Sequence, residues 1–162
     1  MAHEKLTSIE DAVVLSEIAV DAGALMLANG AEIYRVEDTV ERILRSMKDV
    51  DVFSSFNVII ISFSYNGKNY SNMRRVKERG NNLHYVNKVN TFSRNFAAGK
   101  YTLDQALLEI DKIKKSKGTS IPLKILGATV AAGAYSILLG AGINEIISSL
   151  IVGFIGYIFS LF

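Results

Sequence analysis

The chain has 162 residues and a mass of 17.8 kDa, the size of one ordinary domain. It carries 18 Lys and Arg and 16 Asp and Glu for a net charge of +2, and it has no cysteine, which excludes disulfide scaffolds, thiolate nucleophiles and cysteine-ligated zinc. The mean hydropathy of +0.24 is high for a soluble domain. Of the 34 charged residues, only Lys124 and Glu145 lie beyond residue 120. The chain therefore combines a charged N-terminal region with an apolar C-terminal region.

The first predicted element is a helix over residues 7–28, in which apolar side chains recur with helical period. Thr7 or Ser8 can cap its N-terminus, and Glu10 follows Thr7 by three residues, the position of a capping-box acid. Asn29-Gly30 is typical of a left-handed C-terminal cap. We therefore expect the first helix to end there.

A second helix is expected from about residue 31 to residue 48. Its polar face carries Asp38 with Arg42 and Glu41 with Arg45, each pair four residues apart with the acid first, the more favourable order. The two helices should form an antiparallel helical hairpin joined at a glycine.

After the second expected helix, the side-chain pattern changes to that of β-strands and predicts a small antiparallel sheet. Residues 56–65 are rich in β-branched and aromatic side chains, and Tyr65-Asn66-Gly67-Lys68 predicts a type I′ hairpin with a returning strand over residues 69–76. The apolar run 58–61 predicts a strand covered on both faces, whereas the polar returning strand is typical of a sheet edge.

Two further helices complete the charged region. One is expected from about Asn82 to Gly99, and the other begins at Thr102, whose spacing to Gln105 is that of a capping box. We therefore predict an α+β domain over residues 1–118, made of a helical hairpin, a small antiparallel sheet and two helices.

The apolar region contains two uncharged segments, residues 125–142 and 146–162. Each is near the length that crosses a hydrocarbon core of about 30 Å. A buried hairpin of core helices is the alternative, but a domain of this size would have to enclose helices that are apolar on every face. We therefore expect residues 119–162 to be a transmembrane segment with spans at about 123–142 and 145–162, the start of a longer membrane domain.

Lysines gather before the first span and are absent from the connection between the spans, so the positive-inside rule predicts a cytoplasmic N-terminal domain. Small residues four positions apart let helix backbones approach closely, which favours packing against other helices. These pairs are Gly127 with Ala131, Ala128 with Ala132, Ser149 with Gly153, and Gly156 with Ser160.

The densest basic cluster consists of Arg74, Arg75, Lys77 and Arg79. It can bind an anionic substrate, a phosphate or the acidic surface of a membrane, or it can simply protect an edge strand from aggregation. Nucleic-acid binding is not expected, because the domain has 17 basic against 15 acidic residues and its sheet lacks an aromatic stacking motif.

No catalytic residues, cofactor or metal site are predicted. His3 and His84 lack partners at ligand spacing, and there is no G-x-S-x-G or P-loop motif. Serines and carboxylates are plentiful, but nothing in the sequence nominates a nucleophile and its base.

The segment AGALMLANGAEIYRVEDTVERI, residues 22–43, closely resembles the signature of the threonine/serine exporter family of bacterial membrane proteins. Residues 56–70, the segment from Arg74 to Leu83 and the helix from Val89 to Gly99 are also similar, so that the resemblance covers most of residues 10–115. It implies a cytoplasmic domain ahead of a polytopic membrane domain that exports threonine and serine or, in some members, dicarboxylates such as succinate. It also implies, for members in split form, a second small membrane subunit as partner.

The resemblance transfers five motif residues to this chain. Among them Arg35 offers a planar fork for a carboxylate, either that of a substrate or that of an acidic residue in the domain's own core. Glu32 precedes Arg35 by three residues and can pair with it, whereas Glu37 points away from Arg35. A structural or inter-domain role is favoured over direct substrate binding. The complete set of candidate substrate-binding or gating residues is Gly30, Glu32, Arg35, Glu37, Asp38, Arg75 and Arg79.

The sequence therefore predicts part of a multi-pass transporter of the inner membrane, embedded in the lipid bilayer as a homo- or hetero-oligomer, whose soluble domain gates or organises the path. One alternative is a membrane-tethered binding or hydrolase-like domain for which the spans are only an anchor. Another is a purely structural assembly subunit. The exporter reading implies that the chain is not an enzyme.

Overall fold

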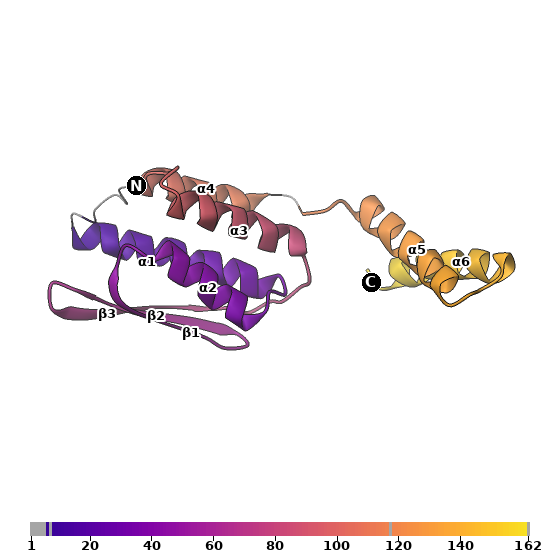
Figure 1. The fold of residues 1–162 in the computed structure, drawn as a ribbon, viewed down its shortest axis with the longest axis horizontal. Helices are drawn as coiled ribbons and strands as arrows, with labels where there is room; N and C mark the ends of the chain where they lie inside the picture. The colour runs from indigo at the N-terminus through magenta and orange to yellow at the C-terminus, as the bar shows by residue number, and fades with distance from the viewer. Residues whose placement is uncertain (1–5, 7, 117, 162) are drawn as a thin grey trace. The chain divides into compact units, whose positions relative to one another are not determined.

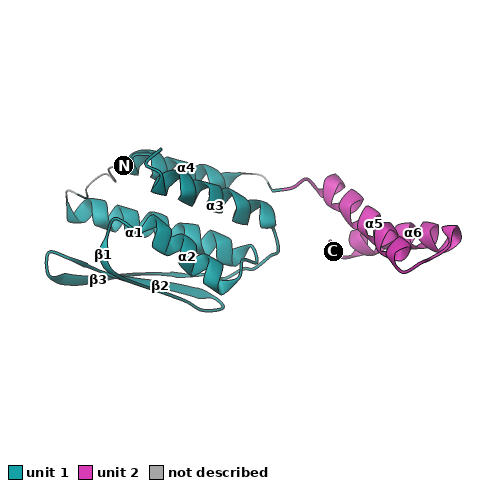
Figure 2. Cartoon of the chain, in the orientation of Figure 1, with its two compact units in different colours: residues 1–118 teal, residues 119–162 magenta. Residues whose placement is uncertain are grey.

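The computed structural model describes residues 6, 8–116 and 118–161. They form two compact units, residues 1–118 and residues 119–162 (Figure 2). Unit 1 contains α1 (Ile9–Ala28), α2 (Ile33–Ile43), β1 (Lys48–Ser54), β2 (Val58–Tyr65), β3 (Lys68–Arg75), α3 (Leu83–Ala97) and α4 (Leu103–Lys115), and unit 2 contains α5 (Ile121–Leu138) and α6 (Ile143–Phe159) (Figure 1). This order confirms the predicted α+β fold followed by a pair of helices.

Unit 1 is built in three layers (Figure 1). The sheet packs on one side of α1 and α2, and α3 and α4 pack on the other side. Because α1 lies between two layers, it is buried around much of its circumference rather than along the single stripe expected of a surface helix. The core of the unit is formed by fully buried residues from all three layers, including Leu15, Ile18, Met26, Val36, Val40, Ile59, Ile61, Val89 and Ile110.

The ends of α1 are set by local hydrogen bonds. Ser8 is the N-cap and forms a capping box with Asp11, so the prediction that Glu10 supplies the acid was wrong, while Thr7 lies outside the described residues. At the other end Gly30 has φ +86°, and the Ala31 N–H donates to the Met26 carbonyl at 3.1 Å, which closes a Schellman motif. The predicted left-handed cap is confirmed.

The second helix is shorter than predicted. It ends at Ile43, and Lys48 already belongs to β1, where it pairs with Ser64 of β2. Leu44 continues the apolar period of the helix and is buried, but it reaches the core from a turn. Helical period in the sequence therefore extends past the point at which strand pairing takes over the backbone hydrogen bonds.

The sheet is antiparallel with the order β1-β2-β3. Asn66 and Gly67 have φ +50° and +75°, which confirms the type I′ hairpin, and β3 is an edge strand as predicted. The prediction that residues 58–61 are covered on both faces was wrong: Ile59 and Ile61 are buried, but Ile60 is 37% exposed. Helices cover one face of the sheet only, so alternate residues of β2 face outward.

The caps of the last two helices of unit 1 follow the predictions. Asn82 caps α3 by accepting a hydrogen bond from the His84 N–H, and Gly99 follows the helix with φ +74°. Thr102 and Gln105 form the expected capping box at the start of α4, with hydrogen bonds of 3.3 and 3.1 Å.

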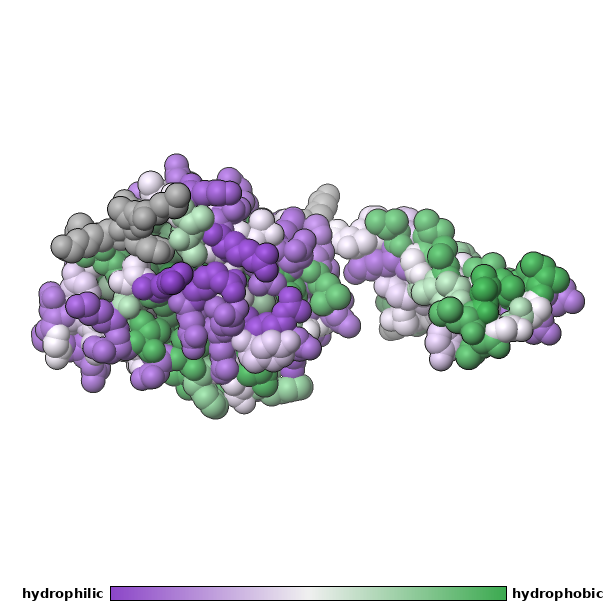
Figure 3. All heavy atoms as spheres, in the orientation of Figure 1, coloured by the Kyte–Doolittle hydropathy of each residue, from purple (hydrophilic) through white to green (hydrophobic). Residues whose placement is uncertain are grey.

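Unit 2 presents a largely apolar surface, in contrast to the hydrophilic face of unit 1 in the same view (Figure 3). By length and composition α5, with 18 residues, can cross a membrane, whereas α6 is a shorter apolar helix of 17 residues. The two helices overlap the segments expected as spans, 123–142 and 145–162, and their position in a membrane stays a prediction. The helix boundaries, Ile121–Leu138 and Ile143–Phe159, also begin slightly earlier than expected.

Small residues let α5 and α6 approach each other. A Cβ at Gly133 would lie 2.5 Å from the Leu150 side chain, and one at Gly153 would lie 2.6 Å from Ala132. By contrast, a Cβ at Gly127 or Gly156 would meet nothing within 4 Å among the described residues. Only part of the predicted small-residue pattern is therefore used for contact inside the helix pair.

Candidate functional site

The segment around Gly30 lies against the loop that follows the basic cluster. The Gly80 N–H donates to the Ala28 carbonyl at 2.7 Å, and the Asn82 N–H donates to the Asn29 carbonyl at 3.1 Å. A Cβ on Gly30 would lie 3.3 Å from the Gly80 carbonyl oxygen. The end of α1 and the loop after Arg79, some 50 residues apart in sequence, are therefore locked together by backbone contacts.

Glu37 connects α2 to the end of β1. Its half-buried carboxylate accepts a hydrogen bond from the Ser54 N–H at 2.8 Å. Two backbone hydrogen bonds hold the turn that follows. The Ser55 N–H donates to the Val58 carbonyl, and the Val76 N–H donates to the Asn57 carbonyl at 2.8 Å. Glu37 thereby anchors the β1–β2 turn, which in turn contacts the end of β3.

Arg75 and Arg79 line one cleft at this end of unit 1. The cleft has a volume of about 360 Å³ and is lined by Phe56, Asn57, Arg75, Val76, Lys77 and Arg79. The Arg79 guanidinium lies 4.1 Å from the centre of the exposed Phe56 ring, a cation–π contact. Within the part of the chain that the structure describes, none of the three cations forms an ion pair, and no carboxylate lines the cleft.

Glu32 and Arg35 lie at the exposed start of α2. Their side chains are 61% and 46% exposed, and the ion pair between them is long, at 3.9 Å. A hydrogen bond to Glu32, together with the negative charge of that residue, raises the pKa of the Tyr34 hydroxyl above its ordinary value. Arg35 is therefore placed at the surface with a weakly held neighbour.

Asp38 belongs to a different contact. It forms an ion pair with Arg42, and Arg42 also donates to the Ser93 hydroxyl of α3 at 3.2 Å. Thr39, one residue on, hydrogen-bonds to Asn90 of α3 at 3.2 Å. Asp38 thus lies beside the α2–α3 interface, and the structure does not bring it to the basic cleft.

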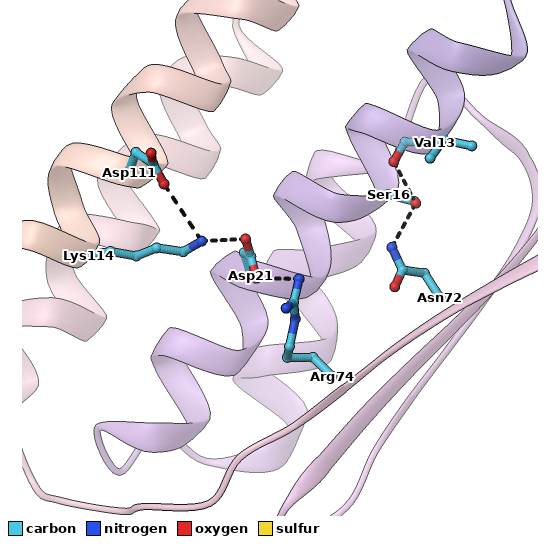
Figure 4. Close-up of polar contacts among 7 residues, drawn as sticks. All are labelled: Val13, Ser16, Asp21, Asn72, Arg74, Asp111 and Lys114. Atoms are coloured by element: carbon cyan, nitrogen blue, oxygen red, sulfur yellow. Dashed lines mark hydrogen bonds and ion pairs between the residues drawn. The ribbon is translucent and has the colours of Figure 1, made fainter.

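Sequence reasoning missed a polar cluster that joins the three layers (Figure 4). Asp21 of α1 pairs with Arg74 of β3 at 2.9 Å and with Lys114 of α4, and the Asp21 side chain is only 18% exposed. Beside it, Ser16 donates to the Val13 carbonyl and accepts a hydrogen bond from Asn72 of β3 at 3.1 Å. No sequence spacing indicates contacts between residues 53 to 93 positions apart, so no local signal was available.

The described residues hold no group of three or more side chains suited to a metal ion. His84 lies at the surface against the edge of Tyr85, and His3 lies outside the described residues. The one described buried polar side-chain atom without a hydrogen-bond partner is the Ser54 hydroxyl. The Ser54 backbone N–H donates to the Glu37 carboxylate, so this pair of residues holds the end of β1 in place.

The chain is a protein of two parts, in which a polar α+β domain precedes a pair of apolar helices. The Gly30 segment and the basic cleft lie at one end of the polar domain. A family model described as "putative threonine/serine exporter" matches residues 17–162, and the chain belongs to that family. The match includes both units, and the family is one of transporters rather than enzymes. No similar curated protein and no similar solved structure was found.

Proposed function

We propose that this chain is part of a bacterial transporter that exports threonine and serine, and that unit 1 gates or organises the transport path from the cytoplasmic side. The observation that carries the proposal is the extent of the family match, which runs from α1 through both apolar helices. The surface of α5 supports a membrane location, since this helix is long and apolar enough to cross a bilayer and only 6% of its span is buried within the chain.

Transport by this chain requires a partner. The described spans contain no Asp, Glu, His, Lys or Arg between Lys124 and Glu145 or beyond Glu145, so they supply no acidic or basic side chain to a path through the bilayer. We propose that a second small membrane subunit, further helices or additional copies of the chain supply the rest of the path. Gly127 and Gly156, where a Cβ would meet no described atom within 4 Å, are suited to such contacts.

The solute is a small molecule with a carboxylate. Threonine and serine follow from the family, and dicarboxylates such as succinate share the group that a guanidinium binds through two hydrogen bonds. Arg35 is placed to act on such a solute or on a partner, because its side chain is exposed and its one described ion pair is the long contact to Glu32.

Inside-out membrane vesicles that contain the full protein and its partner subunit test the proposal. They should accumulate labelled threonine or serine, with succinate as a parallel arm, and Arg35→Ala should reduce the initial rate. Arg45→Ala is the matched control, because it removes an exposed arginine just after α2. A normal rate in Arg35→Ala would refute its role, and ligand binding or hydrolysis without any flux would favour the tethered-domain alternative.

A further inference from the structure

One face of the sheet in unit 1 is uncovered and carries an apolar row. Phe53 of β1 pairs with Ile60 of β2, which pairs with Met73 of β3, so the three side chains form a line across the sheet. They are 59%, 37% and 62% exposed. All helix contacts of the sheet come from α1 and α2 on the opposite face. The described part of unit 1 therefore leaves this apolar row open to an external partner.

The basic cleft adjoins this face at Arg75. Arg75 pairs with Val58, two residues along each strand from the pair of Ile60 and Met73, so the Arg75 side chain lies on the outward side next to the apolar row. Lys77 and Arg79 complete the cations of the cleft, and the Phe56 ring, 69% exposed, lies under Arg79. We name this combined area the basic–apolar face; it comprises Phe53, Phe56, Ile60, Met73, Arg75, Lys77 and Arg79.

The polypeptide leaves unit 1 for the apolar helices at the same end as the cleft. A Cβ on Gly118 would lie 2.6 Å from the Asn82 side chain, and Asn82 follows Arg79 by three residues. Only two residues separate Gly118 from Ile121, the first residue of α5. The connection from this end of unit 1 to α5 is therefore short in sequence.

The chemistry of the face selects one occupant. Exposed apolar and aromatic side chains beside cations match the boundary between acyl chains and headgroups of a membrane, where aromatic rings are enriched and basic residues bind anionic lipid. Arginine forks bind phosphate oxygens through two hydrogen bonds. A small soluble anion would leave the apolar row unused.

We propose that the basic–apolar face docks onto anionic phospholipid headgroups of the bilayer that holds the apolar helices. The inference rests on the membrane location proposed above. It assigns to Arg75, Lys77 and Arg79 the binding of lipid phosphate and to Phe53, Phe56 and Met73 contact with the outer part of the acyl region. Docking of this kind holds unit 1 in one orientation on the membrane surface.

The absence of cysteine from the chain allows a site-specific test with the full-length protein. A fluorophore is attached at Ser71→Cys, on the exposed outer side of β3 opposite Ser62, or at Leu108→Cys of α4 as the control position. Vesicles are made of phosphatidylcholine alone or of an equal mixture with phosphatidylglycerol, with a headgroup spin-labelled lipid as quencher in both leaflets. The label at residue 71, and not that at residue 108, should be quenched about twofold more in the anionic vesicles, and high salt should reverse this.

Charge reversal tests whether binding to anionic lipid depends on the cations of the cleft or only on the net charge of the protein. The triple variant Arg75→Glu, Lys77→Glu and Arg79→Glu should abolish the additional quenching, whereas Lys88→Glu, Arg94→Glu and Lys100→Glu, with the same change in net charge on and just after α3, should retain it. Phe53→Ser with Met73→Ser should weaken it at unchanged charge. Circular dichroism verifies that each variant is folded, and all substituted side chains of the first and third variants are exposed.

Other outcomes overturn the proposal. Equal quenching in both vesicle types, or quenching retained in the cleft variant, would show that the face does not bind anionic lipid. A change in the fluorescence of the label at residue 71 on adding inorganic phosphate, at constant ionic strength and without anionic lipid, would assign the cleft to a soluble anion. A change in its fluorescence that depends on protein concentration alone would assign the face to a second copy of the chain. Extraction of the protein from vesicles by alkaline carbonate reports separately on the membrane location, so failure of that proposal is distinguishable.

Discussion

Asp21 and Arg74 lie 2.9 Å apart and join the middle layer of unit 1 to the edge strand of its sheet. The same carboxylate also pairs with Lys114 of the outer helix layer, so one side chain on α1 bonds to both flanking layers. Two cations on a carboxylate that is only 18% exposed make this a polar contact that links all three layers.

Replacing Asp21 by asparagine should therefore destabilise unit 1. The change removes the charge shared by Arg74 and Lys114, and we expect a loss of about 1–2 kcal/mol in the free energy of unfolding. Asp111→Asn is the control, because Asp111 is 51% exposed and its contacts to Lys114 and Lys115 are long, at 3.8 and 3.7 Å. Urea unfolding in a mild detergent measures both; equal effects would contradict the central role of Asp21.

Gly30 is required by backbone geometry. At φ +86° an alanine is strained, and its Cβ would press on the Gly80 carbonyl at 3.3 Å, so Gly30→Ala should cost about 1–2 kcal/mol of stability. Gly80→Ala is the matched control, since its Cβ would lie 4.0 Å from the nearest described atom, the Ala28 carbonyl oxygen. Thermal unfolding should separate the two variants. An unaffected melting temperature in Gly30→Ala would show that glycine is not required at this position.

Glu37 allows structure and charge to be separated. Glu37→Ala removes the acceptor of the Ser54 N–H and should lower stability by about 1 kcal/mol, whereas Glu37→Gln retains an oxygen acceptor and should lower it less. The second measurement is solute flux. If Glu37→Gln is folded but inactive, the negative charge itself acts in transport; if it is active, the role of Glu37 is to anchor the β1–β2 turn.

The helix pair of unit 2 offers a direct packing test. Gly153→Leu should separate α5 from α6, because a Cβ at that position already lies 2.6 Å from Ala132 and 3.3 Å from the Ala128 carbonyl. Gly127→Leu should leave the pair intact, as its Cβ meets nothing within 4 Å among the described residues. Fluorescence energy transfer between labels at engineered cysteines on the two helices provides the readout. A selective effect of Gly127→Leu on flux or oligomer size would then mark an external helix contact.

Caps and turns were the best predicted features, because they depend on hydrogen bonds within a few residues. The capping box of Thr102 and Gln105, the left-handed Gly30 and the hairpin at Asn66-Gly67 all follow from local sequence. The end of α2 was not predictable in this way. Its apolar period continues beyond Ile43, and pairing of Lys48 with Ser64 across the sheet decides where the strand begins.

The candidate site shows the same division. The sequence nominated Gly30, Glu37, Arg75 and Arg79 separately, through one motif and one basic cluster, and could not indicate how they are arranged. Phe56 was predicted only as part of a strand, yet its ring forms the cation–π contact with Arg79. The uncovered face of the sheet was also missed, because a run of apolar residues such as 58–61 looks the same whether one face or both are buried.

The amino-acid sequence by itself determined most of the helices, the β2–β3 hairpin, most of the caps and the division into a charged and an apolar region, because these depend on local hydrogen bonds and on the distribution of charge along the chain. Only the tertiary structure decided that α1 is enclosed by two layers, that Asp21 meets Arg74 and Lys114, and that the Gly30 segment lies beside the loop of the basic cleft. These contacts join residues 52 to 93 positions apart, and packing in three dimensions selects them from many pairings that the sequence alone would permit.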